Sequence, residues 1–143
     1  MIPGGQRQYN QVQIQTATKG KLIVLLYQGA IRFMKKALLA MERKDMEGKG
    51  QCLIKAQDIV LELLYAVDQK MLDNGNELAR NLQRLYLYSY RRLVQANIHV
   101  DPKAVEEVVA LMENLLGAWE QVVTGEPQGE ASRPSGQSLA LTG

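Results

Sequence analysis

The side chains that most often carry chemistry are rare in this sequence. It has one histidine, His99, and one cysteine, Cys52. A di-iron site in a helical bundle needs Glu-x-x-His pairs on facing helices, and the residue three positions before His99 is Ala96. Cys52 opens the apolar run Cys52-Leu53-Ile54, so we expect a packed thiol without the neighbouring base that a nucleophile needs. The sequence therefore predicts neither a metal centre nor thiol catalysis.

Phosphate and carboxylate chemistry is also poorly supported. The segment Gly48-Lys49-Gly50 does not have the spacing of a phosphate-binding loop. Glu106 and Glu107 are adjacent, and adjacent residues point in different directions on a helix. We predict that the protein is not an enzyme and has no catalytic, cofactor-binding or metal-binding residues.

Composition narrows the remaining classes of protein. Lys plus Arg number 17 and Asp plus Glu 15, and the resulting net charge of +2 does not indicate a nucleic-acid or membrane-surface protein. Hydrophobic residues make up 46% of the 143, which is enough for one globular domain. The single cysteine allows no internal disulfide and fits a reducing compartment. Because residues 1–18 lack the apolar segment of a signal peptide and no apolar run is long enough to span a bilayer, we predict a cytoplasmic protein without membrane insertion.

Turn-forming residues divide the chain between Thr18 and Thr124 into four segments with apolar residues at helical spacing. Helices are expected to begin near Thr18, near Asp45, after Asn76, and after Asp101, where Pro102 fits the first helical position. The second should run to about Asp68, and short connections imply antiparallel neighbours. The sequence predicts an all-α fold, an antiparallel up-and-down four-helix bundle over residues 18–124.

Each expected helix has an apolar stripe that should face the core. The stripes comprise Leu22, Leu25, Leu26, Gly29, Phe33, Ala37 and Met41; Leu53, Ala56, Val60, Leu63 and Val67; Leu78, Leu82, Leu85, Ser89, Leu93 and Ala96; and Val105, Val108, Met112, Leu115, Trp119 and Val122. The second and third helices carry apolar residues beyond these stripes. The excess fits either a self-association face or a groove for a partner segment, and the residues alone favour neither.

The two ends differ from the body of the chain. Residues 1–17 are rich in glutamine and carry apolar anchors, including Tyr9 and Ile14, so we expect an extended N-terminal arm that lies on a surface. Residues 125–143 are rich in Gly, Pro and Ser, and such a segment buries too little apolar area to offset the entropy of ordering it. We expect them to form a disordered tail.

The third expected helix allows one further interpretation. Its residues Arg80, Arg84, Arg91 and Arg92 are interleaved with Tyr86, Tyr88 and Tyr90. Basic side chains beside stacking aromatics can bind single-stranded nucleic acid. The alternative is a solvated basic face whose charge is partly paired with the acidic fourth helix, and we consider that the better interpretation.

Longer motifs in the sequence resemble those of a known family. The first is residues 16–18 with 22–34, and the second is residues 55–60 with 62–63 and Asp68. The third run goes from Asn81-Leu82 through Leu85-Tyr86 and Tyr88 to Arg92-Leu93 and Ala96-Asn97. Together with the late tryptophan Trp119, they resemble the flagellin chaperone family FliS over roughly residues 9–124. The resemblance is specific because the motifs are long and occur in the same order.

The resemblance implies a helical, non-enzymatic secretion chaperone of the cytoplasm. Such proteins bind the C-terminal segment of newly made flagellin, keep it from polymerising too early, and help deliver it to the flagellar export apparatus, whose gate components are further candidate partners. We expect a monomer or weak homodimer that needs no cofactor and binds no nucleic acid. A self-associating structural bundle is the main alternative function.

Helical-wheel positions, and not matched family contacts, give the candidate flagellin-binding residues. They lie on the spare faces of the second and third helices and on the arm, which could cover or complete the groove: Tyr9, Ile14, Ile59, Leu61, Leu64, Tyr65, Tyr86, Leu87 and Tyr90.

Deleting residues 126–143 should change the stability of the fold very little. A segment of this composition contributes few buried contacts, so the thermal midpoint should move by less than about 2 °C. A thermal melt followed by circular dichroism measures the shift. A clearly larger drop would show that the tail docks on the bundle, with Leu139 and Leu141 as the candidate anchors.

Overall fold

The computed structural model describes the backbone of residues 4–124 and the side chains of residues 19–122. Every regular element in this part of the chain is a helix, which confirms the all-α fold. The helices are α1 (Gly4–Glu42), α2 (Met46–Tyr65), α3 (Gln69–Asp73), α4 (Glu77–His99) and α5 (Pro102–Thr124). None of them is both long and apolar enough to cross a membrane within the described residues.

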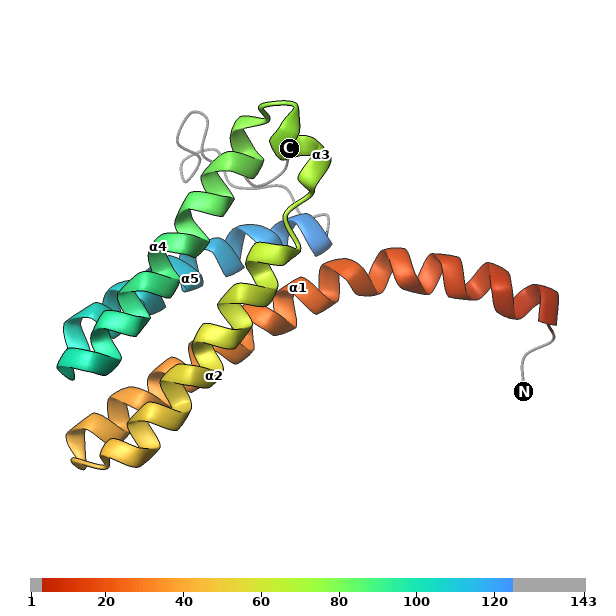
Figure 1. Ribbon diagram of the computed structural model, residues 1–143. Coiled ribbons are helices and arrows are strands. Elements are labelled where there is room, and N and C mark those ends of the chain that lie inside the picture. Colours follow the sequence, from red (N-terminus) through yellow and green to blue (C-terminus); the bar gives the residue numbers. More distant parts are fainter. Residues whose placement is uncertain (1–3, 125–143) are drawn as a thin grey trace.

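The four long helices form an antiparallel bundle, and the short α3 lies in the connection between α2 and α4 (Figure 1). Helix α1 packs against α2 and α5, and α4 packs against the same two helices. Viewed along the axis, the order around the bundle is therefore α1, α2, α4, α5. The seam between α1 and α5 lies on the opposite side from the seam between α2 and α4.

Side-chain caps start the helices where the sequence predicts them. Asp45 Oδ1 accepts a hydrogen bond from the Gly48 N–H at 2.9 Å, and Asn76 Oδ1 accepts one from the Ala79 N–H at 3.0 Å. Asp101 Oδ1 accepts from N–H groups of the first turn of α5 at 3.0 and 3.4 Å. Each cap satisfies donors that a helix leaves unpaired and contributes about 1 kcal/mol to the free energy of unfolding.

Two helix boundaries differ from the expectation. We expected residues 1–17 to form an extended arm, but α1 is continuous from Gly4, so its backbone is helical through residues 4–17 and extends beyond the bundle (Figure 1). Between Gly4 and Glu42 the sequence has no proline to interrupt a helix. Helix α2 ends at Tyr65 and not near Asp68, because Asp68 caps the separate helix α3 through the Lys70 N–H at 2.8 Å. The expected tail, residues 125–143, lies outside the described residues.

One core joins the four long helices. Its buried residues are Tyr27, Ala30, Ile31, Met34, Ala37, Leu53, Ala56, Val60, Leu63, Leu82, Tyr86, Leu93, Ala96, Ala104, Val105, Val108, Val109, Met112 and Leu115. The stripe predicted for α2 is confirmed at its first four positions, while the fifth, Val67, lies beyond the end of the helix. The stripes of α4 and α5 hold at most positions. At the end of the α5 stripe Trp119 is half-buried and Val122 is exposed.

The stripe predicted for α1 was wrong at its first two positions. Leu22 and Leu25 are 54% and 61% exposed. The other predicted members are buried or pack against the core, which also takes in residues outside the predicted stripe, namely Tyr27, Ile31 and Met34. The run from Leu22 to Tyr27 is apolar at every position, so its periodicity does not reveal which side is buried. Packing between α2 and α5 decides the rotation of α1 about its axis.

A pair of tyrosines crosses the middle of the core from α1 to α4. The hydroxyls of Tyr27 and Tyr86 are hydrogen-bonded to each other, and the ring centroids lie 6.3 Å apart. Tyr27 is fully buried and Tyr86 is 2% exposed. Burial raises the pKa of Tyr86 to about 12, and burial together with the neighbouring Tyr86 hydroxyl raises the pKa of Tyr27 further.

Replacing Tyr86 by phenylalanine should change how stability depends on alkaline pH. In the unfolded chain a phenol ionises near pH 10, so above about pH 10 the unfolded state releases protons that the folded state retains, and the free energy of unfolding falls. Tyr86→Phe should cost about 1–3 kcal/mol at neutral pH, because it takes away the hydrogen-bond partner of the buried Tyr27 hydroxyl. That deficit should shrink between pH 10 and 12, because the variant has one fewer buried phenol.

Urea unfolding at a series of pH values measures this difference. Tyr65→Phe is the matched control, since Tyr65 is 78% exposed and this variant removes a phenol without touching the buried pair. Parallel curves for the wild type and Tyr86→Phe would contradict the proposed cause.

Candidate functional site

Helices α2 and α4 meet at a seam whose register is fixed by a buried lysine. Lys49 is 7% exposed and its Nζ donates to the carbonyl oxygen of Asn97 at 2.8 Å. On the same side of α2, a Cβ atom at Gly50 would lie 3.9 Å from Asn97 Oδ1. Because the helices are antiparallel, residues further along α2 lie level with earlier residues of α4, and Leu61 is level with Leu85.

Five of the predicted partner-binding residues lie along this seam. Leu61 is three helical turns past Gly50 on the same side of α2, and Tyr90 is two turns before Asn97 on the corresponding side of α4. Most of the five are half-buried, but Tyr65 is 78% exposed. We call this surface the α2/α4 face; its predicted members are Leu61, Leu64, Tyr65, Leu87 and Tyr90.

The other predicted residues lie elsewhere. Tyr86 is buried in the core against Tyr27, which corrects the expectation that it lies outside the core stripe. Ile59 faces α1, where its Cδ1 atom would lie 3.2 Å from a Cβ placed on Gly29. Tyr9 and Ile14 belong to the stretch of α1 whose side chains are outside the described part of the structure.

The sequence reasoning missed one residue of the α2/α4 face. Ile54 is 52% exposed and lies seven residues before Leu61 and eleven before Tyr65, so the three follow one side of α2. This spacing was a usable signal, but Ile54 follows Cys52 and Leu53 in a run that is typical of a core. Exposure on the folded bundle distinguishes it from its neighbours.

Opposite charges border the α2/α4 face. Asp58 and Glu62 are exposed on the outer side of α2, and Arg84 and Arg91 are exposed on the outer side of α4. The apolar seam therefore has an acidic rim along one helix and a basic rim along the other. A segment that lies in the seam meets a different charge on each flank, which favours one orientation of a partner with unevenly distributed charge.

The tyrosines and arginines considered for nucleic-acid binding are partly engaged within the bundle. Glu107 of α5 accepts hydrogen bonds from Tyr88 Oη at 2.5 Å and from Arg92 Nε at 2.8 Å. These two hydrogen bonds hold the pKa of Glu107 below its usual range, and the bond to Glu107 raises the pKa of Tyr88. With Tyr86 buried as well, α4 does not present its aromatic and basic residues as one continuous stacking surface.

The described side chains offer no obvious place for a metal ion. Among them, no group of three His, Cys, Asp or Glu residues is close enough to hold one. His99 is exposed at the end of α4, and Cys52 is half-buried on α2. The α2/α4 face is suited to binding a partner segment, because it combines apolar area between two helices with charged borders.

Comparison with known proteins assigns the chain to a family. The family model described as Flagellar protein FliS matches residues 3–126. The flagellar secretion chaperone FliS of Bacillus subtilis is 39% identical over 118 residues, covering 82% of this chain and 85% of that protein. The protein of the same name from Salmonella typhimurium is 39% identical over 82% of this chain and 89% of its own length. That of Escherichia coli is 37% identical over 82% and 88%. The match spans the whole bundle and confirms the resemblance seen in the sequence: this chain belongs to the FliS family of flagellar proteins.

Proposed function

We propose that the protein is a cytoplasmic flagellar secretion chaperone that binds the C-terminal segment of newly made flagellin, prevents its premature polymerisation and aids its delivery to the flagellar type III export apparatus. The observation that carries this proposal is the FliS match over almost the entire described chain. The protein acts by binding and not by catalysis. Components of the export gate are further candidate partners.

The α2/α4 face is the surface that we propose for the flagellin segment. Leu61 and Tyr90 are half-buried in the seam, while Ile54 and Tyr65 stand exposed at its edge. An amphipathic helix or an extended segment that lies along the seam would cover these exposed side chains and gain their transfer from water. The N-terminal segment with Tyr9 and Ile14 is a candidate to cover or complete the same face.

Reversible binding follows from the physical character of both partners. The bundle presents a preformed surface and loses little conformational freedom on binding. The flagellin segment is unstructured before assembly under this proposal, so ordering it consumes several kcal/mol of the gross interaction energy. A large contact can then remain weak enough for release at the export apparatus.

Removing the C-terminal segment of flagellin should abolish the complex. Full-length flagellin of the same genome, its C-terminally truncated form and the isolated segment are each co-expressed with the chaperone and tested for co-purification. The full-length protein and the isolated segment should bind, and the truncated form should not. Equal binding of truncated flagellin would overturn the assignment of the client segment.

Single substitutions on the α2/α4 face should weaken flagellin binding without affecting the fold. Ile54 and Tyr65 are exposed, so Ile54→Ala and Tyr65→Ala should each change the free energy of unfolding by less than about 0.5 kcal/mol. Each should weaken binding of the flagellin segment about tenfold, as expected for the loss of a buried aromatic or aliphatic contact. Titration calorimetry measures the affinity.

A matched control removes an equally exposed apolar side chain from the other side of the bundle. Leu39 on α1 is 49% exposed, and Leu39→Ala should leave the affinity for the flagellin segment unchanged. If Leu39→Ala weakens binding as much as the two α2 variants do, the segment does not bind specifically at the α2/α4 face.

A further inference from the structure

Three cationic side chains gather around one aromatic ring at the seam between α1 and α2. The guanidinium carbon of Arg32 lies 5.4 Å from the centroid of the Phe33 ring, and the Nζ atoms of Lys36 and Lys55 lie 5.6 and 5.3 Å from it. The three cations are exposed, whereas Phe33 is half-buried and packs against the core. We call Arg32, Lys36, Lys55 and the Phe33 ring the Phe33 cluster.

The packing of α1 against α2 brings these charges together. Ile59 of α2 lies beside Gly29 of α1, where its Cδ1 atom is 3.2 Å from the position of a glycine Cβ. Because the two helices are antiparallel, Lys55, one turn earlier on α2, is level with Phe33, one turn later on α1. Arg32 Nη2 lies 3.9 Å from the same Cβ position, so the missing side chain of Gly29 leaves room for the guanidinium.

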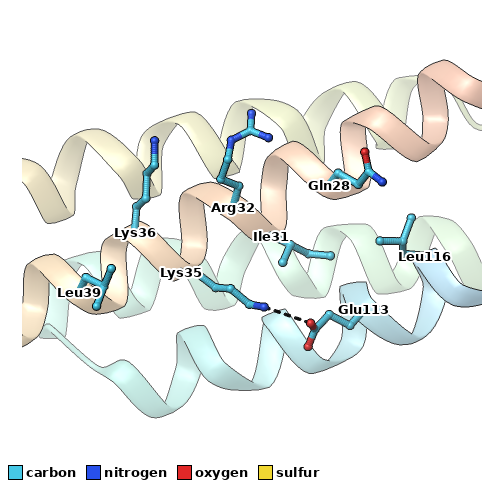
Figure 2. A pocket seen from close by; sticks show the side chains of 8 residues that line it. All are labelled: Gln28, Ile31, Arg32, Lys35, Lys36, Leu39, Glu113 and Leu116. Atoms are coloured by element: carbon cyan, nitrogen blue, oxygen red, sulfur yellow. Dashed lines mark hydrogen bonds and ion pairs between the residues drawn. The ribbon is translucent and has the colours of Figure 1, made fainter.

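The cluster has no carboxylate partner among the described side chains. Of the two ion pairs that they form, one joins Lys35 to Glu113 and the other joins α4 to α5. Figure 2 shows the shallow groove of about 390 Å³ between α1 and α5, which Lys35 crosses to reach Glu113. Arg32 and Lys36 project from the other side of α1, away from α5. Three like charges so close to one another repel, and carboxylates placed among them would relieve that repulsion.

We propose that the Phe33 cluster binds a short acidic segment of a partner protein. Arg32 presents a planar fork that can hold one carboxylate through two hydrogen bonds, and each lysine offers an ammonium to a further carboxylate. Arg32 and Lys36 are one helical turn apart on α1, and Lys55 lies across the seam, so a segment with several carboxylates within a few residues matches the cluster. The ring attracts the cations before the partner arrives, which reduces the entropy lost on binding.

The surroundings of the cluster favour a short segment over a long polyanion. Asp58 and Glu62 are exposed on the outer side of α2, and Glu113 is exposed on α5, so carboxylates lie on both flanks. A nucleic acid or an anionic membrane surface extends beyond the cluster and meets these repelling groups, whereas a segment of a few residues does not. The Phe33 ring is half-buried with cations over it, so it is not free to stack on a base.

The cluster is separate from the α2/α4 face. Lys55 reaches Phe33 of α1, whereas Ile54 and Leu61 follow the side of α2 that borders α4. An acidic segment can therefore bind while another segment occupies the α2/α4 face. The proposal does not depend on flagellin binding, and each of the two can fail without the other.

Titration with a model peptide tests the binding. The probe is a short dye-labelled peptide in which glutamate alternates with serine, and its fluorescence anisotropy is followed as the full chain is added at low salt. A chain with Arg32→Gln, Lys36→Gln and Lys55→Gln should bind it about tenfold more weakly, because three attractive contacts are lost. Added salt should weaken the wild-type complex, since the charges involved are exposed. A peptide with glutamine in place of glutamate should not bind.

A matched variant removes the same types of side chain elsewhere on the bundle. Lys70, Arg91 and Lys103 are exposed on α3, α4 and α5. A chain with Lys70→Gln, Arg91→Gln and Lys103→Gln has the same net charge as the cluster variant and should bind the acidic peptide as tightly as the wild type does.

Charge reversal distinguishes a direct contact from a general loss of stability. A chain with Arg32→Glu, Lys36→Glu and Lys55→Glu should lose the acidic peptide and bind a peptide in which lysine alternates with serine. The wild type should not bind that basic peptide at the cluster. A chain that is merely destabilised would not gain a new ligand, and circular dichroism shows whether the variant is still helical.

A second readout separates this site from the proposed flagellin site. The glutamine variant of the cluster should bind the flagellin segment as the wild type does. Ile54→Ala and Tyr65→Ala should leave the affinity for the acidic peptide unchanged. The opposite pattern, in which the α2 variants lose the acidic peptide and the cluster variant keeps it, would place the acidic segment on the α2/α4 face.

Three further results would overturn the proposal. The first is an acidic peptide that binds the wild type no more tightly than its glutamine counterpart. The second is an equal loss of affinity in the cluster variant and in its matched control, which would show attraction to net charge and not to the cluster. The third is tighter binding of oligothymidylate or of phosphatidylglycerol vesicles than of the peptide, lost in the same cluster variant, which would assign the cluster to a long polyanion.

Discussion

The arrangement of the bundle depends on the burial of four apolar stripes in one shared core, and the Tyr27–Tyr86 pair is the polar constraint inside it. The two rings come from α1 and α4, which lie diagonally across the bundle, and each hydroxyl is the other's hydrogen-bond partner. A buried hydroxyl without a partner would cost about 1–3 kcal/mol. The pair therefore opposes any rotation of α1 or α4 about its own axis. Once these rotations are set, so are the side chains that each helix presents to solvent.

Two surfaces of different character follow from that constraint. On one side, α2 and α4 expose an apolar seam with Ile54 and Tyr65 at its edge. On the opposite side, the exposed Lys35–Glu113 ion pair joins α1 to α5. The apolar seam suits a client that gains affinity by burying side chains.

Charged side chains also connect α4 to α5. Glu107 joins the two helices by accepting from both Tyr88 and Arg92. Tyr88 and Glu107 are exposed, so the cluster adds little to stability, but it directs the Tyr88 hydroxyl and the Arg92 guanidinium toward α5. Two of the basic and aromatic side chains of α4, Tyr88 and Arg92, thus form contacts within the bundle. The remaining exposed arginines, Arg84 and Arg91, border the apolar seam.

The order of residues along the chain was enough to predict the all-α bundle, its antiparallel order and the starts of three long helices, because caps such as Asp45 and Asp101 and the spacing of apolar residues act locally. It also identified the family, because that likeness rests on long ordered motifs. It did not reveal the rotation of α1, since every residue from Leu22 to Tyr27 is apolar and only the positions of α2 and α5 select the buried side. The sequence also led us to place Tyr86 outside the core, because a tyrosine fits either side of a helix. Its burial is favoured by the hydroxyl of Tyr27, which lies 59 positions away in the chain and comes close only in the folded bundle.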